Sequence, residues 1–282
     1  MAITDPWVLA SPELSDRDLS SIARLVYETS GINLHEGKRA LVAARLQKCM
    51  RRGGFRSFRQ YIRHVQSDET GAELTAMLDA LATNHTSFLR EPRHFQFLVE
   101  TVLPPLLARG GSIRGWSAAC ATGEEPYTIA MLLLDGMGLE PAGRVRLLAT
   151  DLSTKALGAA AAGIYKTARL RDIPLHLSRK YFVPGIGTQR GFSRVVPVVR
   201  SLVEFRWMNL LQPADAMAPQ DFIFCRNVMI YFDRAVQQRV IAALEQRLAP
   251  GGYLFVSHSE SLSGIDHGLR WVAPSIYRRE LK

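Results

Sequence analysis

The sequence predicts two domains: an all-α domain over residues 1–88, then an α/β domain with a mostly parallel sheet over residues 89–282. Three observations support this. The 282 residues exceed one minimal domain. Apolar residues recur at helical spacing in the first third of the chain. Beyond residue 89, short β-branched or aromatic runs alternate with helical patterns. The composition, 47% hydrophobic and 22% charged, excludes a disordered tail or a fibrous repeat.

The first domain is expected to be a small helical bundle. Ser15 is the expected N-cap of its first helix, and Gly53-Gly54 is expected to end the second. The four expected helices cover 15–28, 36–50, 58–65 and 74–81. The apolar side of the second helix is expected to carry Val42, Leu46 and Cys49. The basic residues that helical spacing groups on another side of it are Arg45, Lys48 and Arg52.

The positive charge of the chain is concentrated in this domain. The net charge is +9, from 35 basic and 26 acidic residues. Residues 38–63 contain nine basic residues and no acidic one, which leaves 26 basic against 26 acidic residues elsewhere. Such a field steers an acidic partner to one surface, although an isolated basic run is more often a solvated helix face. The absence of interleaved Asp or Glu favours a binding face.

The second domain is expected to alternate strands and helices, as a sheet covered on both faces does. Its fourth strand is almost entirely apolar, which is typical of a buried parallel strand. Residues 164–201 are too long for a simple connection, and we expect them to form a small antiparallel β-subdomain. The expected strands cover 112–118, 144–150, 202–207, 222–226 and 253–257, with a last one within 271–279. The expected helices cover 127–134, 154–162 and 234–248.

Targeting and metal signals are absent from the sequence. It contains no apolar run near the roughly 18 residues of a membrane helix and no secretory signal at its start. The three cysteines are scattered and form no C-x-x-C pair, which favours reduced thiols and a cytoplasmic location. The seven histidines show no pair at metal-ligand spacing, so we expect no metal.

The segment 116–127 (WSAACATGEEPY) reads as a strand, a turn of small residues and the start of a helix. An α/β sheet binds nucleotide-like ligands at such a turn. The segment lacks G-x-G-x-x-G, so hydride chemistry with a dinucleotide is not supported. Glu124 and Glu125 would repel a pyrophosphate but suit a cationic group. The alternative is a capping box, because Thr122 and Glu125 have T-x-x-E spacing.

Asp151 ends the second expected strand. An acid at that place in a nucleotide site accepts hydrogen bonds from the ribose hydroxyls. The alternative, an N-cap for the next helix, is equally compatible with the sequence. A carboxylate for a cationic amino group, a second one for a ribose and no phosphate cradle together describe S-adenosylmethionine as the ligand.

Four segments of the chain together resemble the CheR family, the bacterial chemotaxis receptor methyltransferases. They are 84–91 (NHTSFLRE), 116–127, 224–232 (FCRNVMIYF) and 257–260 (SHSE). The resemblance extends over about residues 15–280, and the order of the motifs makes it specific. It implies a Rossmann-like S-adenosylmethionine-dependent methyltransferase domain with a small antiparallel β insertion, preceded by an all-α N-terminal domain. It also implies methyl transfer from S-adenosylmethionine to glutamate side chains of chemoreceptors, with S-adenosylhomocysteine as product.

The resemblance implies roles for individual residues. Arg90 and Tyr231 match the residues that position the substrate carboxylate, and are the predicted catalytic pair. Leu89 departs from the family, which more often has an aromatic residue there. Simpler roles stay open: Tyr231 as a core aromatic residue, and Asn227 as a helix cap. The predicted cofactor-binding residues are Asn84, Thr86, Arg90, Glu125, Asp151, Asn209, Leu210, Arg226 and Asn227.

The implied chemistry needs few groups. A carboxylate is ionised at neutral pH, so methylating it requires orientation more than a strong base. An arginine fork and a tyrosine hydroxyl suit that task. A nucleic-acid methyltransferase and a non-catalytic cofactor-sensing adaptor are the alternatives, but the family motifs and intact Arg90, Asn227 and Tyr231 argue against them. Ser257-His258-Ser259 lacks G-x-S-x-G, which excludes the familiar hydrolase arrangement.

Partners follow from charge and from the resemblance. The basic helix residues Arg45, Lys48 and Arg52 are expected to bind the acidic cytoplasmic helices of chemoreceptors. The subdomain 164–201 is expected to bind a receptor C-terminal peptide at a sheet edge, with the loop 184–191 (PGIGTQRG) close to it. We expect a monomer that binds no nucleic acid and does not insert into membranes.

Overall fold

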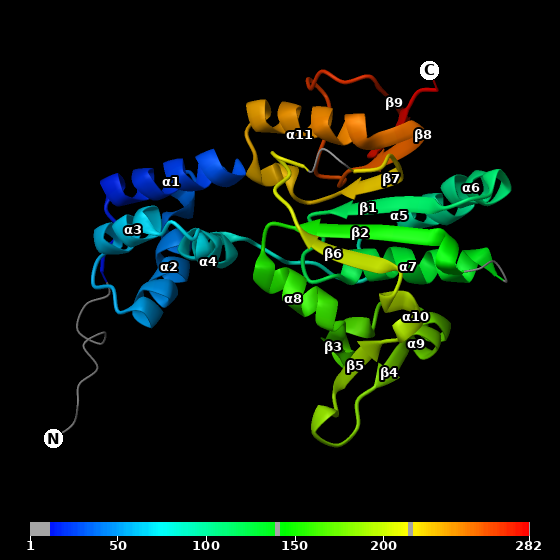
Figure 1. Cartoon of the computed structure of the whole chain (residues 1–282), viewed down its shortest axis with the longest axis horizontal. Helices are drawn as coiled ribbons and strands as arrows, with labels where there is room; N and C mark the ends of the chain where they lie inside the picture. Colours follow the sequence, from blue (N-terminus) through cyan, green and yellow to red (C-terminus); the bar gives the residue numbers. More distant parts are fainter. Residues whose placement is uncertain (1–11, 139–141, 214–216, 282) are drawn as a thin grey trace. The chain divides into compact units, whose positions relative to one another are not determined.

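The computed structural model describes residues 12–138, 142–213 and 217–281 (Figure 1). The chain divides into two compact units, Met1–Thr83 and Asn84–Lys282. The division therefore lies before the expected boundary at residue 88. Phe88 is buried in the core of the second unit, where it contacts Tyr165, which explains why its segment belongs there. No helix among the described residues is long and apolar enough to cross a membrane.

The described part of the first unit is entirely helical apart from turns and one isolated bridge, as predicted. Its helices are α1 (Asp16–Ser30), η1 (Glu36–Lys38), α2 (Arg39–Gly53), α3 (Phe58–Ser67) and α4 (Ala72–Leu81). The Ser15 side chain caps α1 by accepting a hydrogen bond from the Asp18 N–H at 3.2 Å. Gly54, with φ of 72°, ends α2 in the left-handed conformation that glycine adopts at low cost. Both predicted helix ends are confirmed.

The buried side of α2 differs from the prediction at one position. Val42, Leu46 and Met50 are buried, whereas Cys49 is half-buried. Residues four apart lie on one face of a helix, so Met50 continues the line that Val42 and Leu46 begin. The other helices contribute the buried residues Leu19, Ile22, Val26, Phe58, Tyr61, Ile62, Met77, Leu78 and Leu81.

The second unit is built on a seven-stranded sheet of order β6-β2-β1-β7-β8-β10-β9 (Figure 1). The pairs β6·β2, β2·β1, β1·β7 and β7·β8 are parallel, whereas β8·β10 and β10·β9 are antiparallel. The strands are β1 (Ile113–Ala118), β2 (Val145–Asp151), β6 (Val203–Trp207), β7 (Gln220–Cys225), β8 (Leu248–Phe255), β9 (Leu269–Ala273) and β10 (Ile276–Arg279). Parallel neighbours place the carboxyl ends of β2, β1, β7 and β8 along one edge.

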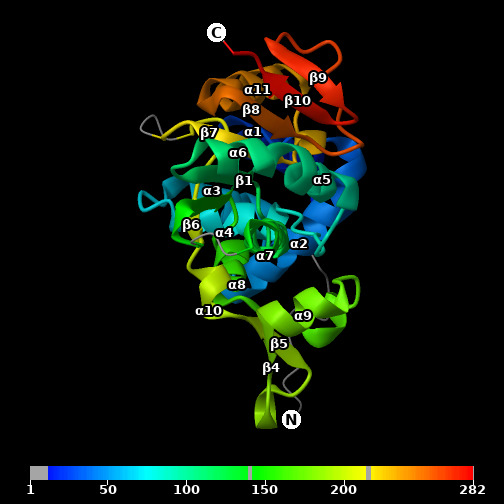
Figure 2. The ribbon, with the colours of Figure 1, turned by 90° about the vertical axis from the view of Figure 1, so that its right-hand side faces the viewer.

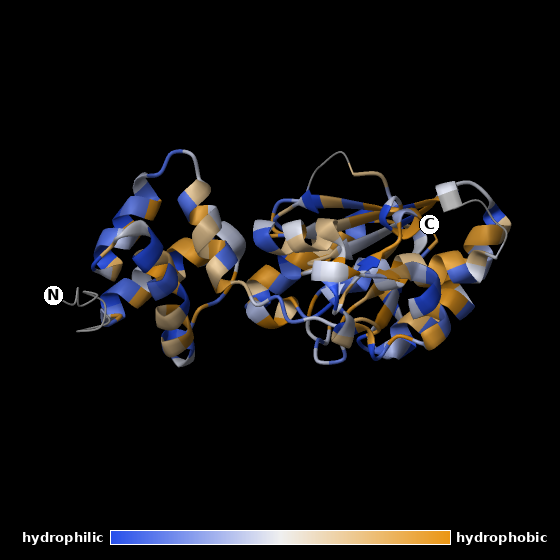
Figure 3. Ribbon diagram, turned by 90° about the horizontal axis from the view of Figure 1, so that it is seen from below, coloured by the Kyte–Doolittle hydropathy of each residue, from blue (hydrophilic) through white to orange (hydrophobic). Residues whose placement is uncertain are grey.

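Helices cover both faces of this sheet. Side chains alternate along each strand, so Phe222 and Phe224 of β7 enter one core while Ile223 and Cys225 enter the other. The helices carry both hydrophilic and hydrophobic residues, as helices that pack by one face do (Figure 3). The first core includes α5 (Pro92–Phe97), the π-helical η2 (Leu98–Val102), α6 (Leu103–Arg109) and α7 (Glu124–Met137). The second includes α11 (Arg234–Arg247). Helix α8 (Thr154–Ala162) follows β2.

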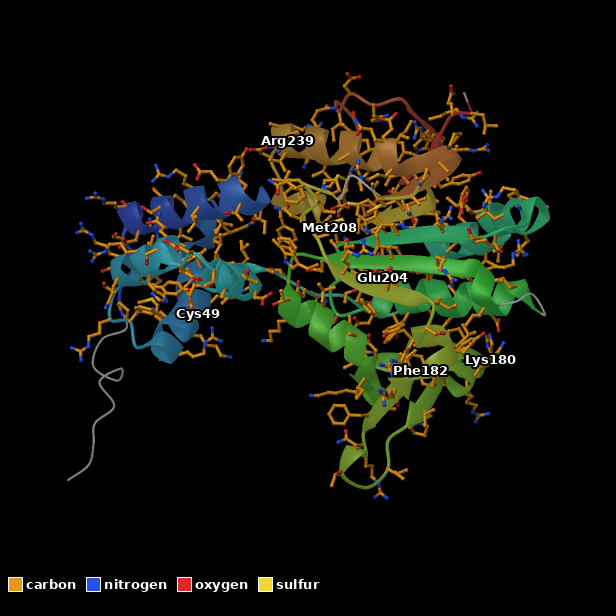
Figure 4. The ribbon with its side chains drawn as sticks, viewed as in Figure 1. Cys49, Lys180, Phe182, Glu204, Met208 and Arg239 are labelled. Atoms are coloured by element: carbon orange, nitrogen blue, oxygen red, sulfur yellow. The ribbon has the colours of Figure 1, made fainter. Side chains whose placement is uncertain are left out.

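The inserted subdomain contains a separate antiparallel sheet of order β3-β5-β4. Figure 2 shows β4 and β5 extending away from the larger sheet. Its elements are β3 (Ile164–Lys166), η4 (Thr167–Leu170), α9 (Leu175–Tyr181), β4 (Phe182–Pro184), η5 (Gly187–Gln189), β5 (Phe192–Val195) and α10 (Pro197–Arg200). The antiparallel insertion is confirmed. Lys180 of α9 and Phe182 of β4 are labelled in Figure 4.

One expected strand is corrected, and several helices were not expected. In the inserted subdomain β5 ends at Val195, because Pro197 lies at the start of helix α10, where a missing N–H costs nothing. The single strand expected within 271–279 is a hairpin, β9 and β10, which turns at Ser275 with φ of 62°. The helices α5, η2 and α6 were not predicted. Pro104 and Pro105 interrupt their apolar pattern but are tolerated in the first turn of α6.

Candidate functional site

The turn after β1 forms one side of the candidate site. The N–H groups of Ala119 and Cys120 both donate to the Thr150 carbonyl, at 2.8 and 2.9 Å, and so fix the turn to the end of β2. Ala119 and Ala121 have positive φ, at 70° and 49°. At Gly123 a Cβ would lie 2.8 Å from the Ala160 Cβ, so only glycine fits between α7 and α8. The small residues of this turn therefore let two elements approach closely.

Asp151 lies at the end of β2 with only 6% of its surface exposed. Its carboxylate accepts hydrogen bonds from the N–H groups of Ala121 and Ser153, each at 2.8 Å. Ser153, not Asp151, caps α8 by accepting from the Ala156 N–H. The alternative interpretation of Asp151 as the helix cap is therefore wrong. These two bonds fix the orientation of the carboxylate at the end of β2.

The two acids at the start of α7 do not form the capping box that the T-x-x-E spacing allows. The N-cap is Gly123, and Thr122 instead donates its hydroxyl hydrogen to the Glu124 carboxylate at 2.6 Å. Glu125 accepts from the Ser117 hydroxyl at 2.6 Å and from Arg226 at 3.0 Å. Burial raises the pKa of both acids, and the guanidinium of Arg226 opposes this at Glu125. Glu125 thus points toward the ends of the strands.

Arg226 follows β7 and has only 2% of its side chain exposed. Its guanidinium lies 3.1 Å from Glu91 and 3.0 Å from Glu125, and it donates to the Arg90 carbonyl. Burial raises the pKa of Glu91, but the charge of Arg226 and a hydrogen bond from Ser257 outweigh it, and the net pKa is lowered. Arg226 therefore joins the 84–91 segment to the start of α7 as a buried cation between two acids.

The segment 84–91 is held by the inserted subdomain as well. The Phe88 ring packs edge-on against Tyr165 and Phe182, with ring centres 4.9 and 5.5 Å apart (Phe182 is labelled in Figure 4). Arg169 of η4 donates to the Thr86 carbonyl at 2.8 Å, and Arg90 donates to the His85 carbonyl at 3.0 Å. These contacts fix the backbone of the N-x-T-x-F-x-R motif beside the start of α7.

The loop after β7 forms another side of the candidate site and contains Asn227 and Tyr231. Asn227 has φ of 59° and donates its side-chain N–H to the Ser257 hydroxyl at 2.7 Å, so it is not a helix cap. Tyr231 ends the short helix η6 (Met229–Tyr231) and is half-buried rather than part of the core.

In the segment after β6, Asn209 accepts from the Leu211 N–H at 3.0 Å, and Leu210 is 8% exposed.

The predicted cofactor and catalytic residues thus come from five segments of the second unit. Asp151, Glu125 and Arg226–Asn227 follow or adjoin the parallel strand ends, and Arg226 connects Glu125 to the 84–91 segment. Sequence reasoning gave no role to Glu91, Ser257 or Glu260. They belong to the 84–91 and 257–260 motifs. In the structure Glu260 and Ser257 both bind Asn227, and Ser257 also donates to Glu91, so these contacts connect the two motifs to the loop after β7.

A possible ligand set for a metal was also missed, because its members are distant in sequence. One ligand atom each of Glu91, His94 and His258 lies within 4.8 Å of the others. The guanidinium of Arg226 is 3.1 Å from the same Glu91 carboxylate, which disfavours a second cation there. Burial, followed by the charge of Arg226, lowers the pKa of His94 to about 4. The absence of a metal stays a prediction.

The predicted receptor-binding residues lie on α2 of the first unit. Lys48 and Arg52 are exposed. Arg45 is half-buried and donates to the carbonyls of Leu81 and Ala82, at 2.6 and 3.0 Å, at the end of α4. The three residues therefore differ: two present their charge to solvent, whereas Arg45 also satisfies a helix C-terminus.

The sheet and its edge define a class of protein. A mostly parallel sheet with an acidic residue at the end of β2, a turn of small residues after β1 and no phosphate-binding glycine loop is suited to S-adenosylmethionine. The residues present fit that cofactor, because buried carboxylates face the strand ends where a cationic amino group and a ribose would need acceptors. The fold and site are those of an S-adenosylmethionine-dependent methyltransferase.

Comparison with known proteins identifies the family. Residues 84–277 match the family described as CheR methyltransferase, SAM binding domain, and residues 17–82 match CheR methyltransferase, all-alpha domain. The chain is 39% identical over 253 residues to a chemotaxis protein methyltransferase of Salmonella typhimurium, covering 89% of this chain and 86% of that protein. It is 40% identical to one of Klebsiella aerogenes (94% and 90% covered) and 37% identical to one of Escherichia coli (94% and 91%).

The chain belongs to the CheR methyltransferase family. The predictions of the family, of an all-α domain followed by a methyltransferase domain, of S-adenosylmethionine as cofactor and of a methyltransferase acting in chemotaxis are confirmed.

Proposed function

We propose that this chain transfers a methyl group from S-adenosylmethionine to glutamate side-chain carboxylates of bacterial chemoreceptors, forming glutamate methyl esters for chemotactic adaptation. The observation that carries the proposal is the match to both family domains, together with relatives named chemotaxis protein methyltransferase over most of the chain. The intact 226–231 loop supports catalysis rather than cofactor sensing alone. We place the protein in the cytoplasm, in line with its three free cysteines, and expect a monomer.

We assign the cofactor to the edge formed by the ends of β1, β2 and β7. Asp151 would accept hydrogen bonds from the ribose hydroxyls, and Glu125 would face the cationic amino group. Asn84, Thr86 and Arg90 would cover it from one side, and Asn209-Leu210 would adjoin the adenine. Asn227 is assigned to the reacting end. Arg226 would act indirectly, because its guanidinium already contacts Glu91 and Glu125 and orients the latter. The cofactor supplies a methyl group that a carboxylate can attack.

Arg90 and Tyr231 are assigned to the substrate carboxylate. That carboxylate is ionised at neutral pH, so the task of the protein is to hold one oxygen in line for attack. Arg90 has one Nη engaged by the His85 carbonyl, and its guanidinium retains further N–H donors for a carboxylate. Tyr231 would donate its hydroxyl hydrogen. Its substitution by Phe should lower the transfer rate about tenfold, the value of one hydrogen bond, with cofactor affinity nearly unchanged.

We assign receptor docking to the basic side of α2. Lys48 and Arg52 are exposed and suited to acidic receptor helices, whereas Arg45 offers less free charge because of its bonds to the end of α4. The exposed residues Arg56, Arg59 and Arg63 extend this positive segment.

We assign peptide binding to the inserted subdomain. A cavity of about 490 Å³ lies against β4 and β5 and is lined by Val183, Ile186, Phe192, Arg194 and Arg200 among others. Ile186 is 86% exposed, an apolar side chain suited to covering a peptide. Within the loop 184–191, a Cβ at Gly185 would lie 2.2 Å from the Gln189 carbonyl oxygen. Gly185 thus allows the loop to close on itself, and the strand edge would bind the peptide.

The decisive experiment is transfer of labelled methyl groups to chemoreceptor cytoplasmic fragments and, in parallel, to RNA. Base-labile label on the receptor supports the proposal, since methyl esters hydrolyse in base. Label on RNA would identify a nucleic-acid methyltransferase, and cofactor binding without transfer would identify an adaptor. Titration with receptor C-terminal peptides tests the subdomain separately: binding at micromolar to tens-of-micromolar concentration is expected, and its absence would contradict that assignment.

A further inference from the structure

The carboxylate of Glu260 accepts hydrogen bonds from four backbone N–H groups. One oxygen accepts from Met229 at 2.8 Å and Ile230 at 3.4 Å. The other accepts from Asn227 and from Ser257, each at 2.9 Å. Glu260 is 6% exposed, so these bonds lie in a largely dry environment. Three of the four donors belong to the loop after β7, and the fourth, Ser257, lies in the segment that follows β8.

This arrangement determines the conformation of Asn227. A non-glycine residue at φ of 59° is held in a sparsely populated region, which persists when its surroundings over-determine it. Glu260 takes the backbone N–H of Asn227, and Ser257 takes its side-chain N–H at 2.7 Å. The Ser257 hydroxyl in turn donates to Glu91 at 2.7 Å, and Glu91 contacts Arg226. Asn227 is therefore held at two atoms by groups that connect to the buried ion cluster.

The same carboxylate orders the helix that ends in Tyr231. Met229 and Ile230 begin η6, and the first N–H groups of a helix have no partner within it. No side chain within the loop caps η6, and Glu260 supplies the missing acceptor from the segment after β8. Tyr231 donates its own N–H to the Val228 carbonyl at 3.1 Å. A change at Glu260 would therefore be transmitted through η6 to Tyr231.

We infer that Glu260 is a positioning residue for methyl transfer: it holds Asn227 and Tyr231 in one rigid loop at the acceptor side of the site. The inference rests on the proposed function, in which Tyr231 meets the substrate carboxylate. Glu260 itself is committed to four backbone donors and does not contact the reacting groups. Its role is to restrict the loop to the conformation in which the Tyr231 hydroxyl and the substrate carboxylate can meet.

The test is the Glu260→Gln variant of the full chain. Glutamine has the same shape, but its NH₂ group faces two N–H donors that then lose their acceptor. We expect kcat at saturating receptor and cofactor to fall at least about tenfold in protein that is folded at the assay temperature, because orientation at the reacting atoms is lost. Asp221→Asn is the matched control. Asp221 is 7% exposed at the start of β7 and accepts from Arg109 and the Arg114 N–H.

Asp221 lies at the opposite end of β7 from the 226–231 loop, so its substitution should lower the melting temperature and leave kcat within about twofold. If Glu260→Gln lowers kcat no more than Asp221→Asn does, Glu260 is merely structural and the inference fails. A second test uses Tyr231→Phe. If Glu260 acts through Tyr231, Glu260→Gln lowers kcat by a much smaller factor in the Tyr231→Phe background than in the unaltered chain. An equal fold-loss of kcat in both backgrounds would overturn the inference.

Two further measurements keep the test decisive. If Glu260→Gln does not fold, Glu260→Asp keeps the charge but is one methylene shorter, and the same loss of kcat is expected. Amide hydrogen exchange at residues 227, 229 and 230 should accelerate in the variant that folds, and unchanged exchange would contradict the role. Failure of the proposed function would appear as no transfer by the unaltered chain. Failure of this inference would appear as full transfer by the variants.

Discussion

The two sides of the candidate site are built in different ways. The cofactor side is made of local features: small residues after β1, Asp151 at the end of β2, and backbone bonds from Ala119 and Cys120 to Thr150. The acceptor side, and Glu125 of the cofactor side with it, is held by long-range contacts of charged groups: Arg226 pairs with Glu91 and Glu125, and Glu260 accepts from backbone N–H groups of the loop after β7. The first depends on strand ends and backbone geometry. The second depends on satisfying charges that folding has removed from water.

This difference has a physical consequence. Replacing a small residue in a turn causes local strain, whereas removing one member of a buried ion cluster leaves its partners charged in a poorly solvated place. The acceptor side should therefore couple activity to global stability, and the cofactor side should not. Three changes test that contrast, and the largest effect is expected in the ion cluster.

Arg226→Ala should destabilise the protein by about 3–5 kcal/mol, because it leaves Glu91 and Glu125, whose side chains are only 15% and 12% exposed, without their cation. Urea unfolding at neutral pH measures this. Arg109→Ala is the control, because Arg109 is half-exposed where it pairs with Asp221, and its loss should cost less. Equal losses of unfolding free energy in the two variants would show that the ion cluster stabilises the protein no more than the Arg109–Asp221 pair does.

The second prediction concerns pH. Burial, followed by the charge of Arg226, lowers the pKa of His94 from 6.5 to about 4, so His94 stays neutral in the folded protein where the unfolded chain binds a proton. The contribution of His94 to stability should therefore fall as pH falls from about 6.5 to about 4, by about 3 kcal/mol at most, while the raised pKa values of Glu124 and Glu125 act in the opposite direction. The lowered pKa of Glu91 adds a loss at lower pH. Unfolding curves across this range measure both.

The matched comparison for this pH effect is between two histidines. His94→Gln should flatten the dependence between pH 6.5 and 4, whereas His176→Gln, at an exposed position, should leave it as it is. If the stability of His94→Gln still falls between pH 6.5 and 4 as it does in the unaltered chain, groups other than His94 cause the pH dependence.

The same contrast explains what the sequence could predict. Helices such as 154–162 and strands such as 112–118 were predictable, because their periodicity and end signals are local. Cys49 was misplaced by one position on α2 because it adjoins the buried face. The helices α5 and α6 were missed because Pro104 and Pro105 resemble breakers until their first-turn position is known.

Local motifs identified Asp151 and Glu125 as candidate site residues, but they did not show which groups these carboxylates contact. Nothing in the sequence pairs Arg226 with Glu91, or Glu260 with Asn227, because such contacts arise when distant segments meet at one sheet edge. The T-x-x-E spacing suggested a cap, but the attraction of buried Arg226 directs Glu125 elsewhere. Tertiary contacts between charges override local spacing when the groups are buried.

On the cofactor side, Asp151→Ala should weaken S-adenosylmethionine binding by about 1–3 kcal/mol, the cost of leaving ribose donors without an acceptor. Titration calorimetry measures it. Because Asp151 also accepts from Ala121 and Ser153, the variant should be compared with Ser153→Ala, which removes the α8 cap and leaves the carboxylate in place. Affinity that is equal for the unaltered chain and Asp151→Ala would contradict the assignment.

The smallest effect is expected on the basic side of α2. Reversing Arg52 to Glu, alone or with Lys48→Glu, should raise the KM for receptor several-fold and leave cofactor affinity unchanged, because exposed pairs each contribute about 0.2–1 kcal/mol. Rising salt should lower receptor methylation by the unaltered chain, and less so by the double variant. Reversing Arg45 together with Arg52 should additionally lower the melting temperature, since Arg45 binds the carbonyls of Leu81 and Ala82 at the end of α4. A rate that does not depend on salt would identify this surface as a solvated face.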